Sequence, residues 1–350
     1  MVQIPKNLKS DRLSSHLSGT GLQRVFQGET RDVWRVDSNS LLVVATDRIS
    51  FSGFVLSELV PKRGEVLTAL AHFWPTKVLY EFNHYLIESE THPGFNDAWD
   101  LREDFLHALP LERCLTVEDM TGEIYPFKMI FRHHIGGSVY KDYLKTGLAG
   151  GQQLPPNLPE WTKLEWPIFT PSTKEDVGHD VNADADYFYS QMAKKGMGVG
   201  GRQAVYMLGQ AYATAYAYAR TKGILILDTK FKVASGPKIV DEILTPDSSW
   251  FVLKEDWEEA MAEGRDPSFM DKQPVIDWGE KTLTPFKDVS GQLITGINKL
   301  NPANPEHVAF VHNLKIPKEV ITDITIRNLT MFRMLTGQSL EDYQKNDMGV

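Results

Sequence analysis

Residues 224–249 read ILILDTKFKVASGPKIVDEILTPDSS, and the fold assignment depends on this stretch. Its first half is apolar and predicts a buried strand over residues 224–233. The preceding residues 202–222 are rich in alanine and tyrosine and predict one long helix, which Gly223 ends in the usual C-terminal position. A helix therefore leads directly into a buried strand.

Working outward, the first half of the chain predicts mainly strands. Residues 23–46 alternate as strand, turn and strand around the turn signal DSNS at 37–40, which predicts a hairpin. Apolar residues at helical spacing predict a helix over residues 67–80. Further strands are predicted over residues 84–89, 114–118 and 127–131.

The second half contains two stretches that predict loops. Residues 136–173 are rich in Gly, Pro and polar residues, which predicts a long ordered loop serving a site. Residues 283–313 carry several asparagines and the breaks at Pro302 and Pro305, which predict an added surface loop. Pro317 then opens a predicted helix that runs to Leu335, with Gly337 as its stop.

Composition excludes several classes of protein. The 350 residues include 37 basic and 46 acidic ones, a formal net charge of −9, and no basic run, so we expect no nucleic-acid partner. No apolar stretch approaches the length of a signal peptide core or a membrane span, so we expect no membrane partner. The lone Cys114 favours a reducing compartment, and we expect a cytoplasmic monomer or small homo-oligomer acting on a small molecule.

Five motifs occur in order along the chain. They are ATDRIS at 45–50, IFTPSTK at 168–174, GHD at 178–180, DTKF at 228–231 and DEILTPDSS at 241–249. Together they resemble the SAICAR synthetase family. Weaker matches extend the resemblance over nearly the whole chain, and they are Arg31 to Val33, Arg132 with Gly137, Ser138 and Lys141, Asp271 to Gln273 with Asp277 and Trp278, and the last helix ending at Gly337.

The resemblance implies an α+β fold with a kinase-like nucleotide cleft. It places a β-rich N-terminal lobe at residues 1–125 and a mixed α/β C-terminal lobe, with substrate loops and a terminal helix, at residues 126–350. It also implies that ATP and Mg²⁺ activate an imidazole-type carboxylate as an acyl phosphate, which the amine of aspartate then attacks. Such chemistry needs carboxylates for magnesium, a lysine beside the phosphates and arginines for the substrate.

The same resemblance implies roles for individual residues. Lys230 and Asp228 are catalytic, Asp241 and Glu242 hold the metal, and Asp180 orients the amine. Nucleotide lies against Gly28, Arg31 and Lys230. The residues expected to hold substrate are Arg48, Ser50, Arg132, Ser138, Lys174 and His179.

Several positions depart from the family pattern. Glu29, Lys128 and Lys232 reverse the expected charge, and Phe51, Ser52 and Gly53 lack an expected carboxylate. Trp250 and Ile276 stand where arginines are expected, which removes partners for a substrate phosphate and offers apolar surface instead. Lys232 would repel magnesium, or pair with Glu29 and close the pocket.

These departures support a second hypothesis beside the ATP-dependent ligase. It is a repurposed paralogue of specialised metabolism that acts on a less phosphorylated molecule without ATP. Glu29, Lys128, Lys232 and Trp250 would then be its working acids, bases and aromatic wall. A third hypothesis is a binding or regulatory protein that keeps the cleft for sensing.

Structural explanations compete with some of these assignments. An Asp-x-Lys pair such as Asp228 and Lys230 is often a surface ion pair, and the loop with Lys174, His179 and Asp180 is also explained by side-chain hydrogen bonds to its own backbone. Adjacent His133 and His134 point to opposite faces of a strand, which argues against a zinc site. The tyrosines of the long helix, Tyr206, Tyr212, Tyr216 and Tyr218, are expected to pack in the core.

Overall fold

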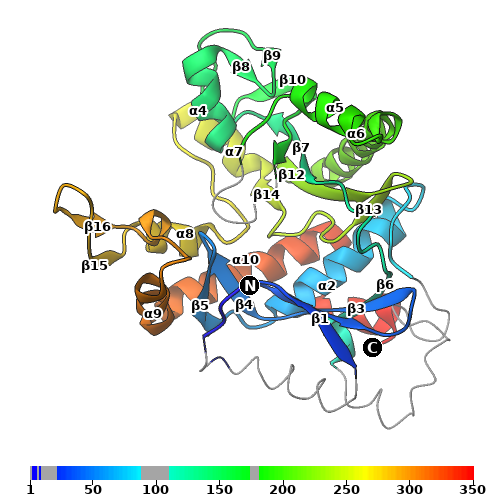
Figure 1. Cartoon of the computed structure of the whole chain (residues 1–350), viewed down its shortest axis with the longest axis horizontal. Coiled ribbons are helices and arrows are strands. Elements are labelled where there is room, and N and C mark those ends of the chain that lie inside the picture. Colours follow the sequence, from blue (N-terminus) through cyan, green and yellow to red (C-terminus); the bar gives the residue numbers. More distant parts are fainter. Residues whose placement is uncertain (1, 6–7, 9–21, 88–109, 174–180) are drawn as a thin grey trace.

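The computed structural model describes residues 2–5, 8, 22–87, 110–173 and 181–350. Two antiparallel sheets and the helices around them form the body of the molecule, and a small hairpin projects from one side (Figure 1). Helices and antiparallel sheets occur in both halves of the chain, so the predicted α+β class is confirmed. Among the described residues, no helix combines the length and apolar character needed to cross a membrane.

The first sheet has the strand order β1-β2-β3-β6. The predicted hairpin at residues 23–46 is confirmed, because β2 and β3 pair in register and the Asp37 carboxylate accepts hydrogen bonds from the backbone of Asn39 and Ser40 at the turn. Helix α2 packs against β3 and β6. The elements of this part are β1 (Gln23–Gln27), β2 (Arg31–Arg35), β3 (Ser40–Ala45), β4 (Arg48–Phe51), β5 (Phe54–Leu59), α2 (Arg63–Phe73), η1 (Trp74–Val78), η2 (Leu111–Arg113) and β6 (Cys114–Glu118).

The second sheet contains the buried strand predicted over residues 224–233. This strand, β12, lies in its middle, paired with β7 on one side and with β13 and β14 on the other. Strand β7 in turn pairs with β10 and β11. The strands are β7 (Phe127–His134), β10 (Lys163–Phe169), β11 (Ser172–Thr173), β12 (Ile224–Ala234), β13 (Lys238–Val240) and β14 (Ser249–Leu253).

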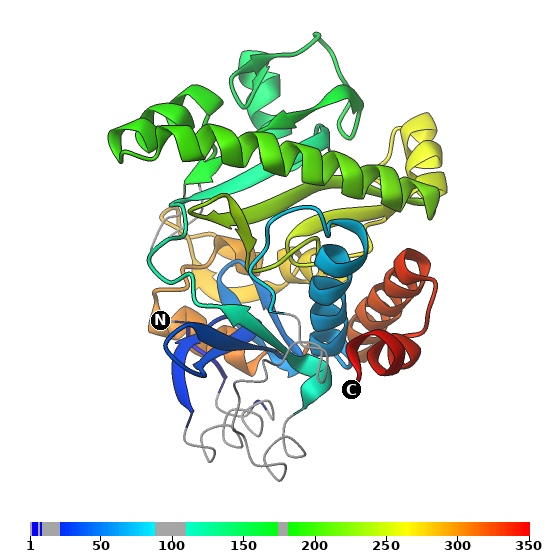
Figure 2. The ribbon, with the colours of Figure 1, turned by 90° about the vertical axis from the view of Figure 1, so that its right-hand side faces the viewer.

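Helix α6 (Gly198–Thr221) lies across the outer face of this sheet (Figure 2). It confirms the predicted long helix, and Gly223 follows it with a left-handed φ of 74°. Tyr212 and Tyr216 are buried as expected, but Tyr206 is 73% exposed. Tyr206 precedes Tyr212 by six positions, which places it on a different side of a helix with 3.6 residues per turn.

The loop predicted over residues 136–173 is largely folded, so that prediction was wrong. It contains α4 (Gly137–Thr146), the short strands β8 (Leu148–Ala149) and β9 (Gln152–Gln153), and β10. Gly147 ends α4 in the left-handed conformation, and Gly150 and Gly151, also left-handed, form the turn between β8 and β9. The glycines therefore mark the ends of short elements.

The surface loop predicted over residues 283–313 is also folded. A hairpin of β15 (Leu283–Lys287) and β16 (Leu293–Thr295) projects from the body, and η3 (Ile297–Lys299) and α9 (Pro305–Asn313) follow. Pro305 is the first residue of α9, and the Asn304 side chain caps this helix by accepting a hydrogen bond from the backbone of Glu306. Asparagine and proline thus signal a helix start here. Within residues 84–87, His84 and Leu86 form isolated bridges and no strand, unlike the prediction for residues 84–89.

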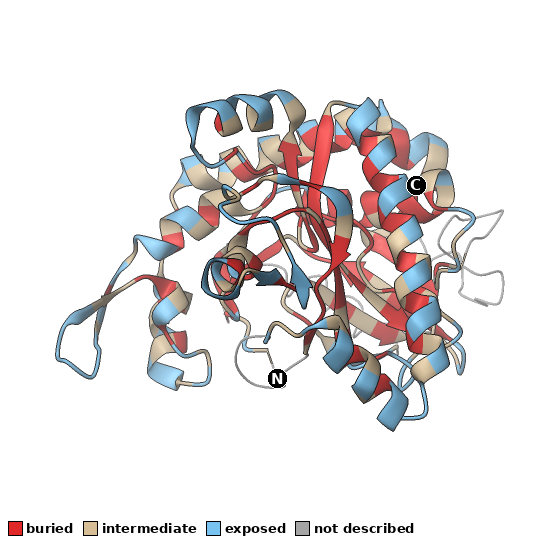
Figure 3. Ribbon diagram, turned by 90° about the horizontal axis from the view of Figure 1, so that it is seen from above, coloured by how far each residue is buried: buried red, intermediate tan, exposed pale blue. Residues whose placement is uncertain are grey.

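One apolar cluster connects the two halves of the chain. It includes Leu70 and Phe73 of α2, Phe231 of β12 and Phe332 of α10 (Lys318–Thr336), the helix predicted from Pro317. Buried residues fill the centre, and the outer helices expose one side each (Figure 3). The remaining helices are α5 (Ala185–Lys194), α7 (Lys254–Glu263), α8 (Gln273–Glu280), α11 (Leu340–Tyr343) and η4 (Gln344–Met348). The division into lobes at residue 125 stays a prediction, and α10 from the end of the chain packs on α2 from its first half.

Candidate active site

Strand β12 presents three polar side chains at alternating positions. Asp228, Lys230 and Lys232 are two residues apart, so they lie on one face of the sheet, while Phe231 and Val233 between and beside them are fully buried in the core. Neighbouring strands add to this face at the level of Asp228. Arg132 of β7 and Trp250 of β14 are its direct partners on either side.

Arg132 and Asp228 form a buried salt bridge across the sheet. Arg132 Nη1 donates to Asp228 Oδ2, and Arg132 Nε donates to Thr170 Oγ1 at 3.0 Å. The guanidinium carbon also lies 5.9 Å from the centre of the Trp250 ring. Burial raises the pKa of Asp228, and the positive charge of Arg132 opposes that rise. The salt bridge therefore holds the Arg132 guanidinium beside the indole ring of Trp250.

A cavity of about 470 Å³ opens over this face of the sheet. Of the predicted site residues that the structure describes, five line it, and they are Arg132, Ser138, Asp228, Lys230 and Trp250. The lining residues that were not predicted as site residues include Lys141, Ser172, Asn182, Asp247, Asp271, Lys272 and Ile276. Among the described lining residues, four side chains are basic and three are acidic, which favours an anionic occupant.

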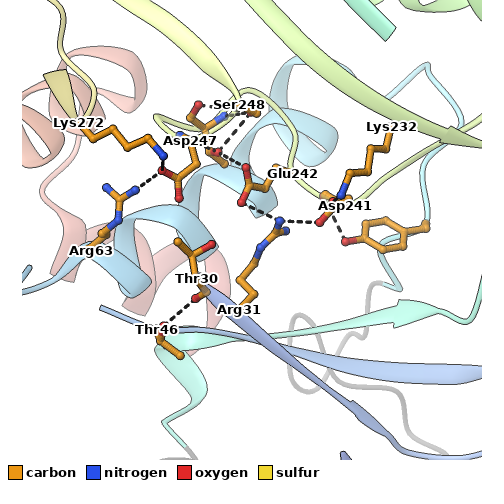
Figure 4. A network of polar contacts seen from close by, with 12 residues as sticks. Thr30, Arg31, Thr46, Arg63, Lys232, Asp241, Glu242, Asp247, Ser248 and Lys272 are labelled. Carbon is orange, nitrogen blue, oxygen red and sulfur yellow. Dashed lines mark hydrogen bonds and ion pairs between the residues drawn. The ribbon is translucent and has the colours of Figure 1, made fainter. Parts of the chain in front are cut away.

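Beside the cavity, the two carboxylates predicted to hold metal meet a basic residue of the first sheet (Figure 4). Arg31 Nη2 lies 2.6 Å from Asp241 Oδ1 and 2.7 Å from Glu242 Oε1. Thr245 Oγ1 donates to the other oxygen of Glu242 at 3.3 Å. Arg31 thus connects β2 to the segment after β13, and it brings three predicted residues together.

Lys232 also pairs with Asp241. Val240, the last residue of β13, is opposite Lys232 in the ladder, so the next residue, Asp241, comes within reach of the ammonium group. Asp241 carries a left-handed φ of 67°, which asparagine and aspartate tolerate better than most residues. Lys232 therefore forms its ion pair with Asp241, and not with Glu29 as suggested from the sequence.

The two neighbouring carboxylates titrate in opposite directions. Burial disfavours the charge on Asp241, but Arg31 and Lys232 outweigh it and hold the pKa of Asp241 well below its usual range. Burial raises the pKa of Glu242, and Asp247 and Asp241 nearby add to the rise. Glu242 is thus the carboxylate whose charge is less well compensated by the protein.

A second ionic cluster joins the loop before β14 to helices α2 and α8. Asp247 pairs with Arg63 of α2, whose side chain is fully buried, and lies 3.7 Å from Lys272 Nζ. The arginine outweighs the effect of burial and lowers the pKa of Asp247. Asp271, the neighbour of Lys272, is 2% exposed, and burial raises its pKa to about 7.

Three residues predicted to bind ligand are buried in this structure. Arg48 is 1% exposed, pairs with Asp32 and donates to the carbonyl oxygens of Gly28 and Glu29. Ser50 is 2% exposed within β4. Gly28 forms the tight turn between β1 and β2, where an added Cβ would lie 2.9 Å from the Arg31 carbonyl oxygen. Arg48 and Ser50 expose little surface to a ligand, and their contacts with substrate stay predictions.

Three further predicted residues lie outside the described part of the chain, and they are Lys174, His179 and Asp180. Ser138, at the start of α4, is exposed at the cavity rim and donates to Asn182 Oδ1 at 3.3 Å. Lys128 lies on β7, and its register partner Ser172 belongs to the cavity lining.

Some of the lining residues that were not predicted lie in motifs that resemble the family, and others lie outside them. Asp247, Lys141, Asp271 and Lys272 belong to motifs that resembled the family, so their positions were marked without a role. Asn182 carried no signal, because only the packing of the chain after β11 brings it to Ser138. Ile276 also lines the cavity and, like Trp250, occupies a position where an arginine was expected.

Comparisons with known proteins identify the family. The family model described as SAICAR synthetase matches residues 24–293. A phosphoribosylaminoimidazole-succinocarboxamide synthase from Mannheimia succiniciproducens is 36% identical over 75% of this chain and 87% of the relative. One from Actinobacillus succinogenes is 33% identical over 90% of this chain and 98% of the relative.

A solved structure gives the same result. The SAICAR-synthase from Saccharomyces cerevisiae, complexed with SAICAR, superposes with a TM-score of 0.68 at 28% identity, and the match covers 91% of this chain and 96% of the yeast chain. The matches span most of both partners in each comparison. The chain therefore belongs to the SAICAR synthetase family, and it is an enzyme of the carbon–nitrogen ligase class.

Proposed function

We propose that this enzyme is an ATP-dependent SAICAR synthetase, which joins the carboxylate of a phosphorylated imidazole nucleotide to the amine of aspartate. One observation carries the proposal. Arg132, Lys141, Lys230 and Lys272 line the cavity over β12, and Asp247 of the same lining lies near Glu242, the chain neighbour of Asp241 (Figure 4). Cations for an anionic substrate and acids for a metal-bound nucleotide are thus adjacent, as transfer of a phosphoryl group to a carboxylate requires.

The roles follow from position and charge. Lys230 lies in the lining two residues from Asp228 and would neutralise charge on the phosphate that leaves the acyl group. Arg132, held by Asp228 and Thr170, would bind the substrate carboxylate or phosphate through its fixed guanidinium. Ser138 would donate a hydrogen bond from the rim. Lys174, His179 and Asp180 keep the substrate-binding and amine-orienting roles that the resemblance implies.

The donor set beside the cavity suits Mg²⁺. Magnesium in nucleotide sites commonly uses one or two carboxylates together with the phosphates. Glu242 and Asp241 offer such oxygens, and the raised pKa of Glu242 reflects a charge that a further cation would stabilise. Among the described residues no group of three or more His, Cys, Asp or Glu could hold a metal by itself. Bound magnesium would supply positive charge against the phosphates, while Arg31 and Lys232 hold Asp241 in place.

The relatives named above give no support to a repurposed paralogue of specialised metabolism. Trp250 and Ile276 do line the cavity, and this apolar wall is the observation behind that alternative. Compartment and oligomeric state remain proposals as well: a cytoplasmic location, supported by the lone buried thiol of Cys114, and a monomer or small homo-oligomer.

An assay of ADP release tests the proposed function. The purified enzyme is given ATP, Mg²⁺, the phosphoribosyl imidazole carboxylate and aspartate, and each component is omitted in turn. We expect ADP and the succinocarboxamide product in equal amounts when all components are present. Product without ATP, or no turnover of the phosphorylated substrate while its dephosphorylated form reacts, would favour the repurposed paralogue instead.

Calorimetry separates nucleotide binding from turnover. Titration of the parent enzyme with a non-hydrolysable ATP analogue should give micromolar binding that depends on magnesium. Lys232→Glu changes the charge beside Asp241, and Lys254→Glu at the start of α7, outside the cavity lining, is the matched control. Binding by Lys232→Glu but by neither the parent nor Lys254→Glu would mean that this chain has lost its nucleotide site.

A further inference from the structure

Asp271 is a carboxylate of the cavity that the proposed roles leave unused. It lies immediately before α8 and lines the cavity together with its neighbour Lys272. One of its oxygens, Oδ1, accepts a hydrogen bond from the backbone N–H of Gln273 at 2.8 Å. The residue as a whole is 2% exposed, so its position is well defined by packing.

The charges around Asp271 come from three elements. Lys272 is its chain neighbour, Asp247 belongs to the loop before β14, and Arg63 belongs to α2. Lys272 and Arg63 lower the pKa of Asp271 and Asp247 raises it, but the effect of burial is larger than any of these. Burial therefore dominates at Asp271, and it raises the pKa of this carboxyl group to about 7. A carboxylate with such a pKa is an effective proton acceptor near neutral pH.

Glu242, whose pKa burial also raises, is one of the two proposed metal ligands. Three other acids near the cavity are poorly suited to accept a proton. Asp228 forms an ion pair with Arg132, and Asp247 forms one with Arg63. Asp241 is paired with two cations, which hold its pKa far below neutrality. A carboxylate held ionised in this way is a weak base. Asp271 differs because the hydrogen bond to its Oδ1 comes from a neutral backbone group.

We propose that Asp271 is the general base that takes the proton from the attacking amine, an inference that rests on the proposed function. The amine nitrogen attacks the acyl carbon, the carbon–nitrogen bond forms, and the bond from that carbon to the phosphate oxygen breaks. Inorganic phosphate leaves with the electron pair of the broken bond. One N–H proton passes to the Asp271 carboxylate, which becomes a neutral acid and later returns the proton to water.

The test compares two half-reactions in Asp271→Asn. Exchange of oxygen-18 between the β,γ-bridging oxygen and the non-bridging oxygens of the β-phosphate of ATP, measured with the imidazole carboxylate but without aspartate, reports formation of the acyl phosphate. Amide formation with aspartate reports the attack of the amine. Asparagine keeps the oxygen that accepts from Gln273, so the fold should persist. Asp277→Asn in α8, an exposed carboxylate outside the cavity lining, is the matched control.

We expect Asp271→Asn to keep the isotope exchange within about threefold and to lose amide formation by about 100-fold or more. Asp271→Glu should restore part of the rate. Hydroxylamine is largely unprotonated and strongly nucleophilic at neutral pH, so Asp271→Asn should convert it to the hydroxamate nearly as fast as the parent does. The rise of the parent's kcat/KM for aspartate through about pH 7 should be absent from the variant.

Two results would overturn the assignment alone. One is unchanged amide formation by Asp271→Asn, and the other is an equal loss of isotope exchange, amide formation and hydroxamate formation, which would indicate a structural role. If the parent enzyme itself shows neither exchange nor amide formation with this substrate, the proposed function fails, and the assignment of Asp271 fails with it.

Discussion

At the scale of single residues, the surroundings of each carboxylate decide what it can do. Asp228, Asp247 and Asp271 line one cavity, and two of them pair with arginine, whereas Asp271 has no arginine partner among the described residues. The pKa of Asp247 is lowered by Arg63 while that of Asp271 is raised to about 7 by burial. Identical side chains around one cavity thus differ in their capacity to accept a proton.

The raised pKa of Asp271 predicts a pH-dependent effect on stability. The carboxyl group titrates at 3.8 in the unfolded chain and at about 7 in the folded protein. Below pH 3.8 the Asp271 carboxyl group is protonated in both the folded and the unfolded state, so its burial costs little stability. As pH rises to about 7, the unfolded chain gives up its proton first, so the folded state loses stability, and above that pH the whole cost is present.

Asp271→Asn removes this titration. Relative to the parent, the variant should gain about 2–3 kcal/mol of unfolding free energy between about pH 5 and pH 8. Urea denaturation at both pH values measures the gain, and the exposed Asp277→Asn should show none. A constant difference between Asp271→Asn and the parent at the two pH values would contradict the raised pKa.

At the scale of elements, helix α6 is fastened to the second sheet by a polar contact as well as by apolar packing. The Tyr212 hydroxyl is buried, donates to the carbonyl oxygen of Ile226 at 2.7 Å and accepts from the backbone N–H of His133 at 3.0 Å. It therefore connects α6 to β12 and β7, the two strands that carry Asp228 and Arg132. A satisfied hydroxyl at this place fixes the helix over the strands of the site.

Tyr212→Phe should cost about 1–3 kcal/mol of stability, because the N–H of His133 loses its partner in a buried position. Tyr206→Phe on the same helix is the matched control, since Tyr206 is 73% exposed, and it should change stability by less than about 0.5 kcal/mol. Thermal unfolding of the three proteins checks both values. Equal effects of the two substitutions would show that the buried hydroxyl contributes nothing.

At the scale of the whole molecule, the last long helix makes the two halves of the chain depend on one core. Phe332 of α10 is fully buried and contacts Tyr343 edge to face, with ring centres 5.5 Å apart. It belongs to the same apolar cluster as residues of α2, α6 and β12. We therefore expect one cooperative unfolding transition even though two sheets are present.

Phe332→Ala should lower the free energy of unfolding by about 3–5 kcal/mol without splitting the transition. Ile326→Ala, on an exposed side of α10, should cost far less. Calorimetry and circular dichroism at several wavelengths measure the transition. Two separate transitions in the Phe332 variant would mean that the lobes fold independently.

Much of the fold and part of the site follow from local sequence. Residues 202–222 and 224–233 carry clear helix and strand patterns, and the period of two along a strand is enough to place Asp228, Lys230 and Lys232 on one face of β12. Glycine and proline are harder to interpret. At residues 136–173 and 283–313 they mark the ends of short elements, and local pattern does not distinguish such ends from a continuous loop.

The order of the motifs along the chain was sufficient to identify the family, because each motif is a local string of residues. The contacts that complete the site join segments far apart in sequence: Arg31 with Asp241 and Glu242, and Arg63 with Asp247. Only the packing of the first sheet and α2 against the second sheet brings these groups together. Burial of Arg48 and the high pKa of Asp271 have the same origin, since desolvation depends on the surrounding chain and not on the residue itself.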